Sequence, residues 1–105
     1  MAAASSDGAP TGDTGCSHSA ACTIVNSRGL HARAAAKFVR LAGGFDAEVM
    51  VEREGARVPA TSILGLMMLA AGRGSTLALD ARGPDAAAAL QALVALVERG
   101  FDETD

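Results

Sequence analysis

The stretch Gly29-Leu30-His31-Ala32-Arg33-Ala34-Ala35 marks the point where a loop is expected to become a helix. It places a histidine at the helix start, with a glycine shortly before it and an arginine shortly after it. The free N–H groups of a first helical turn carry partial positive charge and can hold phosphate oxygens. His31 is therefore a candidate nucleophile that could carry a phosphoryl group.

The neighbours of His31 suit this chemistry. Attack requires an unprotonated imidazole nitrogen, and the positive end of a helix favours the uncharged ring. We expect the backbone amides of Ala32 and Arg33, with the Arg33 guanidinium, to offset the charge of a bound phosphoryl group. Gly29 lacks a side chain and is expected to let a partner's phosphoryl centre approach closely. The plain alternative is a surface histidine that merely begins a helix.

The composition is that of one small globular domain. The chain has 105 residues, half of them apolar, with three Phe and no Trp or Tyr, so alanine and small aliphatic residues must fill the core. The net charge is −3, and no aromatic and basic surface is apparent, which disfavours nucleic-acid binding. No apolar stretch predicts a membrane span, and the first residues do not resemble a secretory signal. We therefore expect a cytoplasmic protein.

The first residues differ in composition from the rest. Residues 1–19 are rich in Ala, Ser, Gly and Thr and are predicted to be a disordered tail, which leaves 20–105 as the folded domain. The two cysteines, Cys16 and Cys22, are too few for a disulfide framework. With His18 between them they fit a zinc site only loosely, so no metal is expected.

Hydrophobic patterns and turn residues predict the order strand, helix, strand, strand, helix, strand, helix. This order predicts an α+β fold, in which one four-stranded antiparallel sheet carries three helices on a single face. The expected segments are 22–25, 31–42, 48–52, 56–58, 61–71, a strand marked by Leu77 and Leu79, and a last helix opened by Gly83-Pro84-Asp85 and ended by Gly100.

Residues 29–35 resemble the active-site segment of the HPr family, the histidine-containing phosphocarriers of the bacterial phosphoenolpyruvate-dependent phosphotransferase system. Phe38-Val39 and Phe45 follow at fitting distances, and the segment from Thr61 to Ala71 is similar to the family's second helix. The resemblance extends from about Ala21 to Glu103. It implies the open-faced sandwich of that family.

The resemblance also implies a function. His31 would accept a phosphoryl group from an enzyme I type protein, itself charged by phosphoenolpyruvate, and pass it to a IIA-type acceptor. Arg33 would stabilise the phosphohistidine. Such a protein is a carrier in phosphoryl transfer rather than a true catalyst, and no metal or organic cofactor is expected. We expect a monomer.

A second motif lies at Ser62. Its plain interpretation is a helix cap, which Thr61 could also provide. In many HPr proteins the serine at this position is phosphorylated by an HPr serine kinase/phosphorylase, which slows phosphoryl transfer. Here Thr61 stands where the family usually has a basic residue, and Ala34 stands where it often has proline. These departures resemble those of HPr-like proteins with a regulatory phosphorelay, and the pathway, sugar uptake or nitrogen and carbon regulation, stays open.

Two groups of residues are candidates for partner docking. Lys37 and Arg40 continue a basic stripe on the first helix, which is either a solvated face or a surface that steers acidic partners. The apolar residues of the second helix are expected to be mostly core, with one or two exposed beside His31. The predicted docking residues are Lys37, Arg40, Ile63, Leu66 and Met67.

Two other functions compete with the carrier. The chain could be an HPr-like interaction module that signals by docking and is switched by phosphorylation of Ser62, without phosphoryl relay. It could also be a small hydrolase that uses His31 as a base. The sequence offers no acidic partner for His31 and no nucleophile motif, which disfavours the hydrolase.

Overall fold

The computed structural model describes residues 17–103 as a four-stranded sheet with three helices. The sheet order is β1-β4-β2-β3, and every neighbouring pair is antiparallel. The predicted α+β fold is confirmed. The elements are β1 Ser17–Thr23, α1 Ala32–Ala42, β2 Glu48–Arg53, β3 Ala56–Pro59, α2 Ile63–Met68, β4 Thr76–Arg82, α3 Ala86–Glu98 and the 3₁₀ turn η1 Gly100–Asp102.

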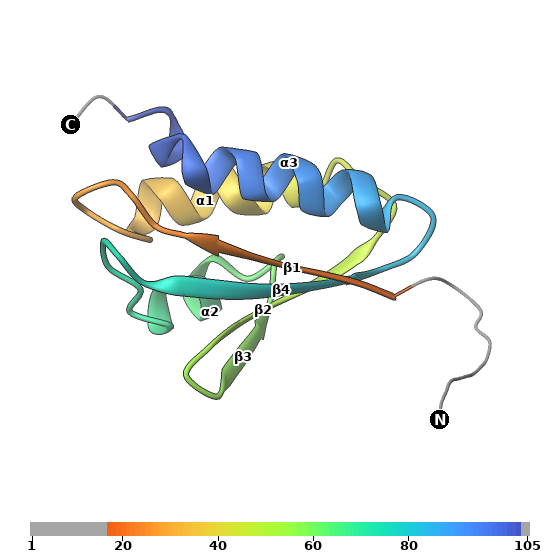
Figure 1. The fold of residues 1–105 in the computed structure, drawn as a ribbon, viewed down its shortest axis with the longest axis horizontal. Helices are drawn as coiled ribbons and strands as arrows, with labels where there is room; N and C mark the ends of the chain where they lie inside the picture. Colours follow the sequence, from red (N-terminus) through yellow and green to blue (C-terminus); the bar gives the residue numbers. More distant parts are fainter. Residues whose placement is uncertain (1–16, 104–105) are drawn as a thin grey trace.

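One face of the sheet is buried and the other is open. Along β4, Leu77, Leu79 and Ala81 are buried, whereas the residues between them point to the opposite face. Figure 1 shows α1 and α3 side by side over the same face of the sheet, with α3 lying along β1 and β4. Phe38 and Phe101 are fully buried in this layer, and alanines and small aliphatic residues fill the space around them.

The hairpin between β2 and β3 follows its local sequence. Val49 and Val51 are buried, as their alternation predicts. Glu54 and Gly55 both have positive φ values, 50° and 86°, as the two central residues of a tight hairpin turn require. The predicted turn is confirmed.

The first strand begins earlier than predicted. β1 starts at Ser17 and pairs with β4 from Ser17↔Arg82 to Thr23↔Thr76, so residues 17–19 belong to the sheet and not to a tail. These polar residues give no hydrophobic alternation, and pairing with the β4 strand beside them places them in the sheet. The remaining predicted tail, 1–16 with Cys16, lies outside the described residues.

The second helix ends earlier than predicted. α2 stops at Met68, and Ala70 takes a positive φ of 53° instead of continuing the helix to residue 71. The chain turns so that Leu69 and Ala71 enter the core. Burial of these two side chains outweighs the helix preference of the local sequence.

Cys22 faces the core and is 2% exposed. Its burial, with the charge of Glu98 as a second cause, raises the pKa of the thiol to about 11. Within residues 17–103 there is no cluster of three His, Cys, Asp or Glu that could hold a metal ion. In the same part of the chain, no helix has the length and apolar character needed to cross a membrane.

Candidate functional site

His31 is the N-cap of α1, as the sequence predicts. Its backbone is extended, with φ −79° and ψ −179°, and its carbonyl accepts the first helical hydrogen bond from Ala35 N at 2.8 Å. The His31 side chain makes no capping hydrogen bond to this helix, and the first turn contains no acidic residue. The first-turn amides, among them those of Ala32 and Arg33, thus lie beyond the reach of the helix's own carbonyls.

The loop before His31 is pressed against the chain that follows α2. Leu30 N donates to Ala71 O at 2.9 Å, and Gly29 has a φ of +67°. A Cβ on Gly29 would lie 2.4 Å from Ala71 O and 2.8 Å from the Cα of Gly72. Gly29 is buried, so the expectation that it clears space for a partner's phosphoryl centre is wrong. Its lack of a side chain allows the loop to pack.

Glu103 is the acidic partner that the sequence did not reveal. Its Oε2 pairs with His31 Nε2, although the two residues lie 72 positions apart in the sequence. The carboxylate comes from the segment that follows η1, which folds back toward the start of α1. No local pattern marks Glu103, because its position depends on the path of the whole chain. The statement that His31 has no acidic partner is therefore corrected.

Asn26 joins this pair to the loop. Its Nδ2 donates to Glu103 Oε1 at 3.0 Å and to Gly29 O at 2.9 Å. The residue is only 3% exposed, and its own Oδ1 is buried without a hydrogen-bond partner in the described part of the chain. Asn26 therefore links the loop before His31 to the C-terminal segment.

The basic residues of α1 divide into two kinds. Arg33 is exposed, and no hydrogen bond or ion pair ties its guanidinium to another residue within 17–103. Lys37 is half-buried, and its Nζ donates to Phe101 O at 2.7 Å. Arg40 is exposed. Lys37 thus has a structural contact that holds η1 against α1, whereas Arg33 is available to an incoming anion.

Ser62 is confirmed as the cap of α2. Its Oγ accepts from Gly65 N at 2.9 Å, while Thr61 is exposed and does not cap. A Cβ at Gly65 would lie 2.9 Å from that Oγ, so the glycine leaves room for the cap.

The apolar residues of α2 are mainly on the surface, and not mainly in the core as expected. Leu66 is fully buried, so its prediction as a docking residue is wrong: it belongs to the core. Around it, Ile63 and Met67 are 41% and 40% exposed, and Leu64 and Met68 are exposed still further, at 68% and 75%. We call these four residues the α2 patch.

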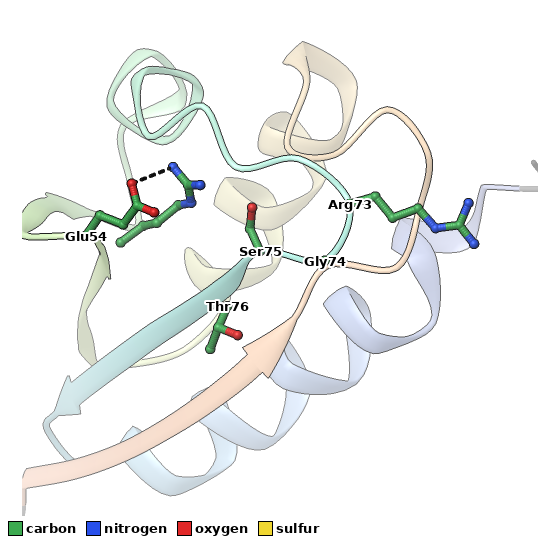
Figure 2. Close-up of a pocket in the computed structure, with 6 residues that line it drawn as sticks. Glu54, Arg73, Gly74, Ser75 and Thr76 are labelled. Carbon is green, nitrogen blue, oxygen red and sulfur yellow. Dashed lines mark ion pairs between the residues drawn. The ribbon is translucent and has the colours of Figure 1, made fainter.

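A hollow of about 490 Å³ lies at the end of the sheet, lined by Arg53, Glu54 and residues 73–76. Its two arginines do not converge on a common point. Arg53 pairs with Glu54 at 3.4 Å, and Figure 2 shows the Arg73 side chain extending away from that pair. The hollow therefore lacks the paired guanidinium groups that would hold a phosphate, and it does not include His31.

The chain is similar to known phosphocarriers over most of its length. The family described as "PTS HPr component phosphorylation site" matches residues 18–99. Phosphocarrier protein HPr of Cupriavidus necator is 53% identical over 81 residues, which cover 77% of this chain and 91% of that protein. Phosphocarrier protein NPr of Shewanella violacea is 51% identical over 81 residues, which cover 77% and 89%.

Solved structures agree with this similarity. The crystal structure of HPr-C-His from Thermoanaerobacter tengcongensis matches with a TM-score of 0.79 at 40% identity, covering 84% of this chain and 99% of that one. The fold, the family match and the sequence similarity thus lead to one conclusion: the chain belongs to the HPr family and is a phosphocarrier of the phosphotransferase system.

Proposed function

We propose that His31 carries the phosphoryl group on its Nδ1 atom and receives it from an enzyme I type phosphohistidine protein. The observation that carries this proposal is the pairing of His31 Nε2 with Glu103 Oε2. An ionised carboxylate accepts hydrogen bonds and cannot donate them. Nε2 therefore holds the proton, and Nδ1 keeps the lone pair that attack on phosphorus requires.

The transfer is an in-line exchange between two imidazole rings. The Nδ1 lone pair forms the new N–P bond, and the electron pair of the old N–P bond returns to the donor's ring nitrogen. The His31 ring gains one positive charge as the phosphoryl group arrives, and Glu103 lies beside Nε2 to offset it. No proton leaves the ring in this step.

The phosphoryl oxygens need positive partners of their own. The amides at the start of α1, those of Ala32 and Arg33 among them, have no carbonyl partner within the helix, and together with the exposed Arg33 guanidinium they supply these. Catalysis in such a site consists of positioning and electrostatic stabilisation. A IIA-type histidine then takes the group by the same exchange in reverse, and we place this relay in the cytoplasm.

The first test is the intact mass of the protein after incubation with phosphoenolpyruvate and a cognate enzyme I. Wild-type protein is expected to gain one acid-labile phosphoryl group, and the His31→Ala variant none. His18→Ala is the matched control, because His18 is the other histidine of the sequence and lies on β1. An adduct that persists in His31→Ala, or one lost in His18→Ala instead, would contradict the proposal.

A second step tests the acceptor. Phosphorylated wild-type protein, separated from enzyme I, is mixed with a purified IIA-type domain from the same genome, and the mass of both proteins is followed. Movement of the group to the IIA-type domain supports the relay. If the phosphoryl group stays on His31 with every such domain, the acceptor is of another class.

The exposed α2 patch favours a second function, an interaction module switched at Ser62. Four large apolar side chains on a six-residue helix form a surface suited to a partner. A docking module keeps its partners when His31 is replaced, whereas a carrier loses its function. Partner capture with His31→Ala and with Ser62→Asp separates the two: binding lost only in Ser62→Asp supports the switch.

A further inference from the structure

We propose that Asn26 is a positioning residue for phosphoryl transfer, acting through Glu103 to hold the His31 ring in its reactive tautomer. This inference rests on the proposed function of His31. It concerns three residues from three places in the chain: the loop before α1, the start of α1 and the segment after η1. Only the fold brings them together.

The orientation of the Asn26 side chain is fixed by its partners. Its Nδ2 lies within hydrogen-bond distance of two acceptors, Glu103 Oε1 and Gly29 O. The reverse orientation would place the amide oxygen against both acceptors, so the amide must donate to each. The same orientation leaves the buried Oδ1 without a partner in the described residues, which is unfavourable in a core.

The two oxygens of the Glu103 carboxylate contact different residues. Oε1 accepts from Asn26, and Oε2 accepts from His31 Nε2. The Asn26 amide therefore fixes the plane of the carboxylate, and the carboxylate fixes the tautomer and the orientation of the ring. Residues behind a functional histidine commonly act in this way.

Solvent exposure increases from Asn26 through Glu103 to His31. Asn26 is 3% exposed, the Glu103 side chain 13% and the His31 side chain 22%. The ring thus stands at the surface where a partner protein reaches it, while its support lies below. Since Glu103 is already in contact with the ring, no rearrangement is needed when charge develops on it during transfer.

Two readouts test the proposal, one of them without any phosphoryl donor. The ¹⁵N chemical shifts of the neutral His31 ring report which nitrogen carries the proton. Wild-type protein is expected to hold the proton on Nε2, and Glu103→Gln and Asn26→Asp to mix the two tautomers. Initial rates of phosphorylation by limiting enzyme I are expected to fall by about tenfold in each variant.

The double variant distinguishes positioning from a merely structural role. In Asn26→Asp alone, two carboxylates oppose each other and the bridge breaks. With Glu103→Gln added, the new amide can donate to the carboxylate introduced in the loop, while its oxygen accepts from His31 Nε2. The hydrogen bond to Gly29 O stays lost in the double variant. The double variant is therefore expected to transfer faster than Asn26→Asp alone, and well above the product of both losses. Asp102→Asn is the matched control, since its carboxylate pairs with Arg99.

Each outcome of these experiments supports or overturns the positioning role of Asn26. Wild-type tautomers in Glu103→Gln and in Asn26→Asp, or losses that multiply in the double variant, would overturn the positioning role. If Asn26→Asp fails to fold, the proposal is still tested by the His31 tautomers in Glu103→Gln and by whether the double variant folds. If wild-type protein is never phosphorylated on His31, the proposed function fails, while the NMR readout still tests the arrangement.

Discussion

The backbone of Gly29 lies directly against the carbonyl of Ala71, so that the loop before His31 packs on the segment that follows α2. Leu30 N donates to that same carbonyl at 2.9 Å. Two features of the structure require glycine at position 29. Its φ of +67° lies in the left-handed region that favours glycine, and a Cβ would lie 2.4 Å from Ala71 O.

We therefore predict that Gly29→Ala lowers the free energy of unfolding by about 1 kcal/mol or more in addition to the cost of backbone strain. Urea denaturation measures the difference. Gly74→Ala is the matched control, because Gly74 also has a positive φ, +89°, but a Cβ there meets nothing within 4 Å. Equal losses in both variants would show that the contact with Ala71 does not matter.

Arg33→Ala is expected to leave folding unchanged and to slow phosphorylation. The side chain is exposed and has no hydrogen-bond or ion-pair partner within residues 17–103, so its removal breaks no such interaction there. It deprives the phosphoryl oxygens of charge-assisted hydrogen bonds, which corresponds to a rate loss of about tenfold or more. Stopped-flow or quench measurements with enzyme I check this. Arg82→Ala, an exposed arginine at the end of β4, is expected to transfer at the wild-type rate.

Ser62→Ala is expected to cost about 1 kcal/mol of stability, because the hydroxyl that caps α2 is lost. Ser62→Asp keeps a capping oxygen and should unfold near the wild-type midpoint while placing a negative charge beside the α2 patch. Thr61→Ala should shift stability by less than about 0.5 kcal/mol, since the exposed Thr61 does not cap. A larger loss in Thr61→Ala than in Ser62→Ala would contradict this assignment.

The residues of α2 should separate into one that stabilises and four that bind. Leu66→Ala removes a fully buried side chain and is expected to cost about 2–5 kcal/mol. Met68→Ala, at 75% exposure, should cost less than about 0.5 kcal/mol. Calorimetric titration with enzyme I then tests the surface: Met67→Glu should weaken binding without unfolding the domain. Unchanged affinity would remove the α2 patch from that interface.

Local signals in the sequence predicted what local structure determines. His31 at a helix start, the cap at Ser62 and the turn at Glu54-Gly55 all follow from a few neighbouring residues, and the structure has each of them. The buried face of α2 could not be predicted in the same way. Its six residues are apolar on almost every side, so no hydrophobic periodicity identifies Leu66 as the buried residue.

The support behind His31 could not be predicted from local pattern. Glu103 and Asn26 lie 77 positions apart, and neither is part of a motif. Their meeting depends on α3 and η1 returning the chain to the start of α1. The strand at Ser17 has a similar cause, since it pairs with β4, which is distant from it in the sequence. Contacts distant in sequence decide both features.

Stability should fall in the alkaline range because of Cys22. Burial first, and the charge of Glu98 second, raise the pKa of this thiol from 9.0 to about 11 in the folded protein. The folded state thus holds the proton more tightly than the unfolded chain. The contribution is complete below pH 9.0 and is lost as the pH rises through about 11. The loss amounts to about 3 kcal/mol. Urea midpoints across this pH range measure the loss of stability.

The comparison is Cys22→Ala, in which stability should decline less steeply with rising pH. Glu98→Gln should keep most of the wild-type decline, because burial is the larger cause of the raised pKa. The same slope in wild type and Cys22→Ala would show that the thiol does not titrate in this window.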